Sequence, residues 1–256
     1  MFAAFGLTQG IFDKCDCGSS NYNALQMRAQ KRFSHNYTLL ASYTYSKTLD
    51  YGEFGTPTNQ YNVGSDYGPA DFNRPHVFTM AHTLALPFGK GHAMLKNANG
   101  VAQALAGGWE FNGITTLESG LGFSPALSNN ASLNSDMLLR PDQIASPTSG
   151  ISQDRNLWFN PASYSVPAAF TFGGASRNSI RGPNLFSADL ALNKSFNLTE
   201  RYHVQFRWET FNAFNRTNLG LPNNAVDTGS AGLISGLASG PTLGMRRMQF
   251  GLRLGW

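Results

Sequence analysis

The stretch at residues 246–256 alternates strictly, from Arg247 to the last residue of the sequence, between apolar and other side chains. The apolar positions are Met248, Phe250, Leu252, Leu254 and Trp256, and the positions between them are Arg247, Gln249, Gly251, Arg253 and Gly255. A period of two residues is the period of side chains along a β-strand. Soluble domains usually end in frayed polar residues, whereas outer-membrane β-barrels turn apolar side chains to lipid and polar ones to the lumen. The stretch predicts the closing strand of a transmembrane barrel, and its apolar residues form a predicted C-terminal barrel-assembly signal.

Composition excludes one of the two ways of crossing a membrane. The chain has 256 residues, a mean hydropathy of −0.25 and 13% charged residues. It contains no apolar run of about 18 residues, which a transmembrane helix would need. Only helices and closed barrels satisfy the backbone in lipid, so the chain is either a β-barrel or a soluble protein. A large secreted β-sandwich fits the same composition.

Charge and cysteine content point to no nucleic acid, metal or cofactor. The net charge of +4 is spread thinly, with only short basic pairs such as 31–32 and 246–247, whereas a nucleic-acid footprint needs a concentrated stripe. Cys15 and Cys17 are the only cysteines. Without a second cysteine pair a zinc site is less favoured than a strained loop-tip disulfide or two idle thiols.

The beginning of the sequence does not look like an export signal. Residues 1–10 lack a basic segment and a continuous apolar core, which a secretory signal requires. A protein bound for the outer membrane needs such a signal, so we expect that Met1 is not the true start. Residues 1–20 are interpreted as the remnant of an extracellular loop and residues 21–256 as barrel.

About seven segments of roughly ten residues alternate as strands do, and that length crosses a bilayer when tilted. They are residues 21–32, 37–45, 75–86, 109–119, 185–196, 201–211 and 246–256. A short helix is expected near 101–106. These strands predict an all-β, antiparallel fold.

The connections between these segments mostly alternate between short and long. Long, glycine-rich and polar connections occupy 46–74, 120–184 and 212–243, while 33–36 and 197–200 are tight turns. Short periplasmic turns and long extracellular loops are typical of outer-membrane barrels. A soluble sandwich has no reason to sort its loops in this way.

An odd number of strands does not close a bacterial antiparallel barrel, whose strand number is normally even. An open barrel would leave unpaired N–H and C=O groups in lipid. We therefore expect the sequence to be the C-terminal part of a larger barrel.

Several short motifs then resemble one family of transporters. In chain order they are 22–26 (YNALQ), 158–164 (WFNPASY), 172–173 (FG), 177–183 (RNSIRGP), 198–201 (LTER) and 211–218 (FNAFNRTN). Together they resemble the C-terminal barrel region of TonB-dependent transporters of the Oar-like type, which abounds in acidobacteria and carries a carboxypeptidase-regulatory-like N-terminal domain. The resemblance extends from about residue 21 to the end of the sequence.

This resemblance implies a barrel of about 22 strands with a plugged lumen in the outer membrane of a Gram-negative bacterium. It implies energy-coupled uptake of a scarce nutrient, a siderophore, oligosaccharide or peptide, without catalysis. The implied partners are outer-membrane lipid, the barrel-assembly machinery, a plug and further strands not seen in this sequence, and a TonB-type energy transducer that acts through the plug.

Two groups of side chains are predicted to serve such a function. Loop aromatics suit the binding of sugars, peptides or siderophores, or else form small cores of the loops themselves. They are Tyr51, Phe54, Tyr61, Tyr67, Trp158, Phe159 and Tyr164. The charged residues predicted to face the lumen are Arg207, Glu209, Arg247 and Arg253, because a charge facing lipid near the midplane costs about 2–4 kcal/mol.

Catalysis and two further functions are weaker alternatives. Asp50 with Glu53, or Asp66 with Asp71, offer paired carboxylates, but nothing in a loop fixes their separation. The other functions are an autonomous outer-membrane pore assembled from several chains and a secreted carbohydrate-binding β-sandwich.

Overall fold

The computed structural model describes most of the chain. The described residues are 18–33, 37–52, 57–59, 61–89, 94–95, 97, 99–129, 139–197, 201–240 and 243–255. Cys15, Cys17, Phe54 and Trp256, together with the predicted loop remnant up to residue 17, lie outside them.

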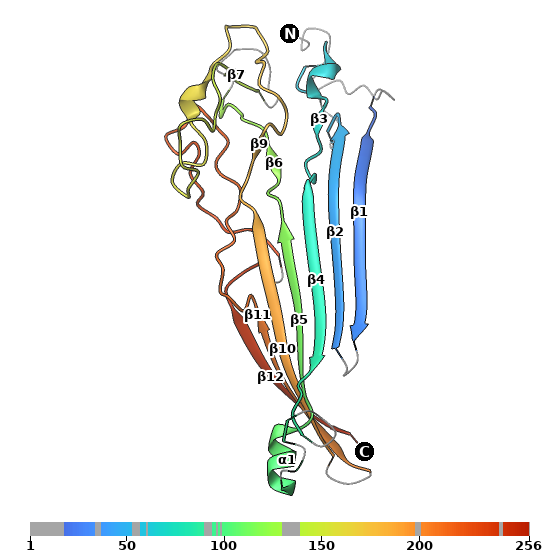
Figure 1. Cartoon of the computed structure of the whole chain (residues 1–256). Helices are drawn as coiled ribbons and strands as arrows, with labels where there is room; N and C mark the ends of the chain where they lie inside the picture. The colour runs from blue at the N-terminus through green and yellow to red at the C-terminus, as the bar shows by residue number, and fades with distance from the viewer. Residues whose placement is uncertain are drawn as a thin grey trace, which may run out of the picture.

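Seven long strands form one antiparallel sheet in which each strand pairs with the next long strand in the chain. Their order is β1 (Asn21–Phe33), β2 (Tyr37–Asp50), β4 (His76–Ala85), β5 (Trp109–Glu118), β10 (Leu185–Asn197), β11 (His203–Phe211) and β12 (Arg247–Gly255). Among the described residues, β1 and β12 each pair with one long neighbour, so the sheet is open at both edges (Figure 1). The predicted antiparallel all-β fold is confirmed, and the bounds of the strands lie close to those predicted, except that β2 ends five residues later than predicted.

The strand register separates the side chains into two faces. The apolar face, as we call it, carries among others Leu25, Met27, Leu39, Tyr43, Phe78, Met80, Leu84, Phe111, Leu117, Leu190, Leu192, Phe206, Trp208, Phe250 and Leu252. The polar face carries Gln26, Arg28, Ser42, Thr44, Thr79, Thr83, Asn112, Thr116, Ser187, Asn193, Gln205, Arg207, Gln249 and Arg253. Directly opposed residues share a face in an antiparallel pair, so alternation along each strand adds up to two chemically different surfaces. The apolar face also carries polar residues, among them Lys31, Lys47, His76, His82 and Lys194.

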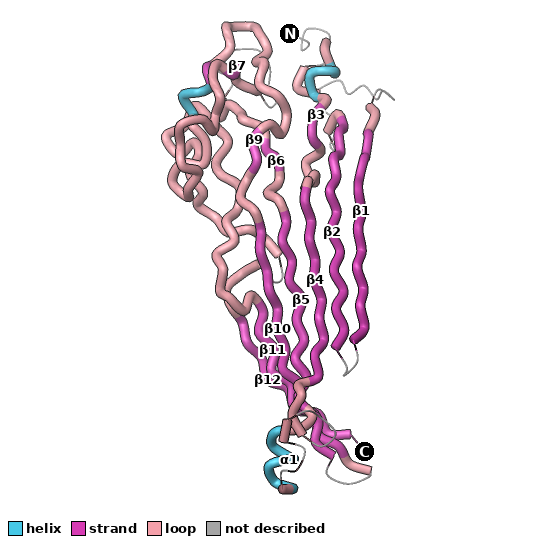
Figure 2. The backbone as a smooth tube through the Cα atoms, viewed as in Figure 1, coloured by secondary structure: helices cyan, strands magenta, loops and turns pink. Residues whose placement is uncertain are grey.

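The two ends of the sheet differ in their connections. The long connections 51–75, 119–184 and 212–246 gather at one end, and the C-terminus lies at the other (Figures 1 and 2). That other end carries the brief connections after β1 and β10 and the segment 86–108 with helix α1 (Gly100–Ala106). Asn99 caps α1 by accepting a hydrogen bond from the Ala102 amide. No helix among the described residues has the length and apolar character needed to cross a membrane.

The long connections contain short elements of their own. These are η2 (Val63–Asp66), β3 (Gly68–Pro69), β6 (Gly122–Phe123), β7 (Asp142–Gln143), η3 (Pro161–Ser163), β8 (Tyr164–Ser165) and β9 (Ile180–Arg181). β3 pairs with the end of β2, β6 with β9, and β7 with β8. The sequence prediction treated all of these residues as irregular loop.

The FNAFNRTN motif explains how the chain leaves β11. Asn212 and Asn215 adopt positive φ angles of 49° and 50°, which asparagine tolerates better than most residues. Asn218 is buried, and its side chain accepts from the Phe186 amide and donates to the Phe186 carbonyl, both at 2.9 Å. Beyond the end of β11, the Asn218 side-chain amide thus makes the hydrogen bonds to β10 that a neighbouring strand would make.

Candidate functional site

The connections 51–75, 119–184 and 212–246, called loop 1, loop 2 and loop 3, form an outer loop cluster. Loops 2 and 3 are joined by backbone hydrogen bonds, including those from the Trp158 amide to the Gly232 carbonyl and from the Val226 amide to the Ala126 carbonyl, both 2.9 Å. Loops 1 and 2 are joined mainly by arginine side chains. Three long segments thus become one body above the sheet.

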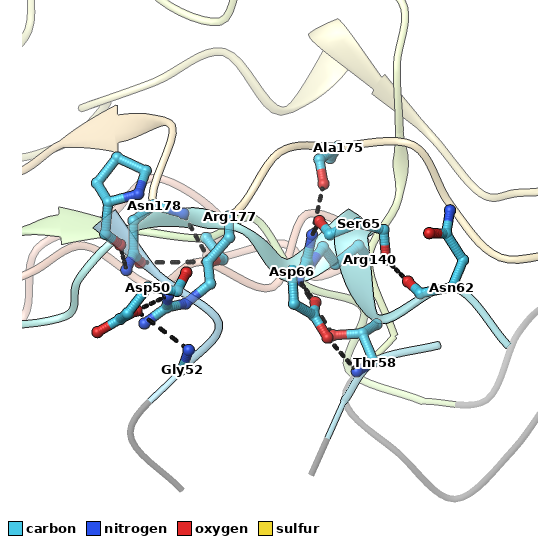
Figure 3. Close-up of polar contacts among 12 residues, drawn as sticks. Asp50, Gly52, Thr58, Asn62, Ser65, Asp66, Arg140, Ala175, Arg177 and Asn178 are labelled. Atoms are coloured by element: carbon cyan, nitrogen blue, oxygen red, sulfur yellow. Dashed lines mark hydrogen bonds and ion pairs between the residues drawn. The ribbon is translucent and has the colours of Figure 1, made fainter. Parts of the chain in front are cut away.

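Arg177 of loop 2 clamps the base of loop 1 (Figure 3). Its buried guanidinium donates to the Asp50 carboxylate at the end of β2 and, at 2.8 Å, to Asp71. Asn178 donates to the same Asp71 oxygen at 2.6 Å and to the Pro69 carbonyl at 2.7 Å. Burial alone would lower the pKa of Arg177, but the two carboxylates raise it above its ordinary value. The charged clamp is therefore the stable form.

Arg140 forms a second buried clamp further along loop 1 (Figure 3). It donates to the carbonyls of Ser65 and Ala175, at 3.0 and 3.3 Å, and forms an ion pair with Asp66. Asp66 also accepts from the Thr58 amide at 2.7 Å. Burial lowers the pKa of Arg140, and the nearby charge of Arg177 lowers it further.

Arg181 completes the set of loop 2 arginines that bind loop 1. Its guanidinium donates to the Asn73 carbonyl at 2.9 Å, and Asn73 in turn accepts from the Thr48 amide of β2 at 3.1 Å. Burial lowers the pKa of Arg181. The sequence analysis missed these roles, although Arg177, Asn178 and Arg181 lie in the RNSIRGP motif that it singled out.

Phe159 and Tyr164 were expected either to touch a ligand or to form a small core of the loops, and the structure buries them inside the cluster. Phe159 is 0% exposed and contacts the rings of Phe123 and Tyr164, with centroids 5.8 and 6.2 Å apart. Burial raises the pKa of Tyr164 to about 12. Trp158 packs against this core, and its indole donates to the Arg181 carbonyl at 2.7 Å. Loops of this length need a core of their own, so Phe159 and Tyr164 offer no ring to a ligand in this arrangement.

Two tyrosines of loop 1, Tyr61 and Tyr67, are exposed, and Tyr51 is half-buried. Tyr61 is 83% exposed, while Tyr51 and Tyr67 lie together with ring centroids 5.0 Å apart. Phe72, which the sequence analysis did not select, is also exposed. Loop 1 thus presents aromatic rings on a base that Arg177, Arg140 and Arg181 hold in place.

The charged residues predicted to face the lumen lie together on the polar face. Glu209 accepts hydrogen bonds from Arg207 on its own strand and from Gln249 on β12. The register places Arg253 opposite Gln205 and Arg247 opposite Phe211 on the same face. The four apolar residues of β12 that are described, Met248, Phe250, Leu252 and Leu254, are all exposed on the opposite face.

The carboxylates of loop 1 that the structure describes, and Asp50 at the end of β2, are engaged in ion pairs. Asp50 and Asp71 bind Arg177, and Asp66 binds Arg140. Within the described ranges no group of three His, Cys, Asp or Glu residues is close enough to hold a metal ion. The ion pairs between these acidic groups and the loop 2 arginines hold loop 1 in place. The arrangement therefore suits the rigid presentation of a binding surface.

A family model described as an outer membrane beta barrel domain matches residues 3–249. The chain belongs to this family. The protein is therefore an outer-membrane barrel protein, as the alternation of the strands and the sorting of the loops predicted. No curated protein and no solved structure matches the sequence.

Proposed function

We propose that this outer-membrane barrel protein is the ligand-facing part of a TonB-dependent receptor of the Oar-like type. It would take up a scarce nutrient, a siderophore, oligosaccharide or peptide, by energy-coupled transport without catalysis. The observation that carries the proposal is the outer loop cluster, where buried arginines fix long loops that present exposed aromatic rings. The order of the motifs from YNALQ to FNAFNRTN also supports a receptor of the Oar-like type.

In this proposal the apolar face contacts lipid and the polar face lines the lumen. The exposed rings and leucines of β12 suit hydrocarbon. Arg207, Glu209, Arg247 and Arg253 lie on the opposite face, where water or a plug would solvate them. The open edges of β1 and β12 require further strands, because unpaired backbone groups are costly in lipid. Strands of a longer polypeptide, a plug and the TonB-type transducer would complete the transporter.

Ligand recognition would occur at the exposed rings of loop 1. Tyr51, Tyr67 and Tyr61 combine an apolar ring with a hydroxyl, which suits sugars, peptides and siderophores. The Arg177 and Arg140 clamps reduce the conformational entropy that loop 1 would lose when it binds.

The proposal is tested by uptake in the native host. A strain that lacks the gene is supplied in turn with labelled ferric siderophores, oligosaccharides and peptides, with and without a protonophore. We expect the deletion and the protonophore to abolish uptake of one ligand class. In the complemented strain, Tyr61→Ala with Tyr67→Ala weakens uptake of that ligand, while Leu221→Ala, at an exposed position of loop 3, leaves it unchanged.

An autonomous pore remains the second candidate, because the open sheet could also be completed by other copies of the chain. The full protein is reconstituted in planar bilayers to separate the two functions. A steady open conductance, together with uptake that resists the protonophore, would support the pore and contradict the receptor.

A further inference from the structure

The connection between β4 and β5 lies at the opposite end of the sheet from the loop cluster and is packed onto the apolar face. The Trp109 indole on that face donates to the Leu105 carbonyl of α1 at 2.9 Å. A shallow apolar pocket lies between α1 and the sheet and is lined by Leu86, Phe88, Leu95, Ala106, Trp109 and Leu192. Helix α1 therefore lies beyond the ends of the strands (Figure 1) and contacts the sheet through residues of its apolar face.

The outward side of α1 is apolar as well. Val101 and Leu105 are 71% and 66% exposed, and exposed Ala104 lies between them at helical spacing. Met94 and Leu95, just before the helix, are also exposed. In water such a surface would be unfavourable, since the burial of large apolar side chains lowers the free energy.

Lys194 joins this helix to the sheet. It lies on the apolar face, is only 2% exposed, and donates to the Leu105 and Gly107 carbonyls at the end of α1. Its ammonium also lies 4.9 and 4.7 Å from the ring centroids of Trp109 and Phe196. A cation at a helix C-terminus and over aromatic rings is favourable. The one buried lysine of the described strands is thus used to hold α1 against the apolar face.

We propose that α1, with Met94 and Leu95, is an interfacial anchor that inserts Val101 and Leu105 among the phospholipids of the inner leaflet. Its apolar surface is continuous with the apolar face through Trp109 and the pocket beside it. The brief turns of outer-membrane barrels face the periplasm, which puts α1 at the inner leaflet. Helices of this kind lie about 5–10 Å deep at the boundary between headgroups and acyl chains. The inference rests on the outer-membrane location and not on transport.

The anchor is tested with an environment-sensitive fluorophore on single cysteines. In full-length protein with Cys15→Ser and Cys17→Ser, Val101→Cys and Leu105→Cys are labelled and the protein is reconstituted in phosphatidylethanolamine–phosphatidylglycerol vesicles. Quenching by lipids with nitroxides at defined depths is compared with quenching by aqueous iodide. We expect blue-shifted emission, strong lipid quenching, weak iodide quenching, and a depth of about 5–10 Å for both labels.

Two control positions make the outcome decisive. Leu252→Cys on the apolar face reports whether the sheet is in the bilayer, and Tyr61→Cys in loop 1 reports full exposure to water. If Leu252→Cys is quenched by lipid while positions 101 and 105 behave like position 61, the anchor is disproved although the barrel is inserted. Protection from iodide without lipid quenching would mean that another protein covers α1, and would also overturn the proposal.

Discussion

The seven-stranded sheet and the outer loop cluster differ in where they bury their side chains. Among the buried apolar residues that the structure describes, only Leu185 and Ala188 belong to the long strands, and both are in β10. The loop cluster has a true core around Phe159 and Phe123, with arginines buried beside carboxylates. In the proposed orientation lipid covers the apolar face of the sheet, whereas the loops carry their own interior. Identical substitutions should have different effects in the two regions.

The largest effect is expected from Arg177→Met in the loop cluster. The change leaves the nearly buried Asp50 carboxylate without its charged partner, and breaking a buried ion pair costs about 3–5 kcal/mol. Hydrogen exchange of loop 1 and loop 2 amides in the full protein should accelerate strongly, while amides of the sheet stay protected. Arg155→Met serves as the control, because Arg155 lies at an exposed loop 2 position and its guanidinium donates, among the described residues, only to the Ile234 carbonyl, at 3.0 Å, so that the change removes a neutral hydrogen bond in place of an ion pair. Equal protection of the loop 1 and loop 2 amides in both variants would contradict the role of Arg177 as a clamp.

A slightly smaller effect is expected from Leu252→Arg on the apolar face. An arginine facing lipid near the midplane costs about 2–4 kcal/mol, and Leu252 lies near the middle of β12 with its side chain exposed. Gln249→Arg is the matched change on the polar face, where Glu209 can pair with the new charge. Urea unfolding of the vesicle-inserted protein measures both. Equal losses of unfolding free energy in Leu252→Arg and Gln249→Arg would contradict the assignment of the apolar and polar faces.

Gly113→Ala tests how closely the apolar face is packed. A Cβ at this position would clash with the ring of His82 and lie 2.9 Å from Leu190 Cδ2. Overpacking typically costs about 1–3 kcal/mol, and we expect the lower part of this range because the His82 ring can move. The double variant Gly113→Ala with His82→Ala should recover part of the loss in the same unfolding assay. An absence of coupling between the two changes would contradict the contact.

The smallest effect is expected from Arg207→Met on the polar face. Arg207 pairs with Glu209, but its side chain is 51% exposed, so solvent screens the pair and its contribution should be below about 1 kcal/mol. Compared with Arg177→Met, the variant measures what burial adds to an arginine–carboxylate pair. A loss as large as that of Arg177→Met would show that the polar face is as dry as the loop cluster.

The sequence predicted the sheet well because strand periodicity is a local signal. The alternation that predicts β12 (Arg247–Gly255) lies entirely within residues 246–256. The predicted start of helix α1 differs from the observed start by one residue. Strand β2 (Tyr37–Asp50) extends further than the predicted 37–45, because its outer half pairs with β1 and β3. No alternation in 46–50 marked that extension clearly.

The loop cluster was harder to predict because its contacts join distant residues without any period. Arg140 and Asp66 are separated by 74 positions, and Arg177 and Asp50 by 127. Aromatic residues in a polar loop fit a ligand platform and a small core equally well. The structure assigns Phe159 and Tyr164 to the core and leaves Tyr61 and Tyr67 accessible, and sequence composition could not have separated these pairs.

The side chain of Asn218 has a consequence for a crowded membrane. Strand β10 has 13 residues and β11 has nine, so the outer part of β10 extends beyond its neighbour. A free strand edge recruits strands from other molecules. Asn218 fills both hydrogen-bonding positions of Phe186, and the Ala213 amide bonds to the Ala188 carbonyl at 2.7 Å. Loop 3 therefore occupies this part of the β10 edge and leaves no free backbone groups at Phe186 for a strand of another molecule.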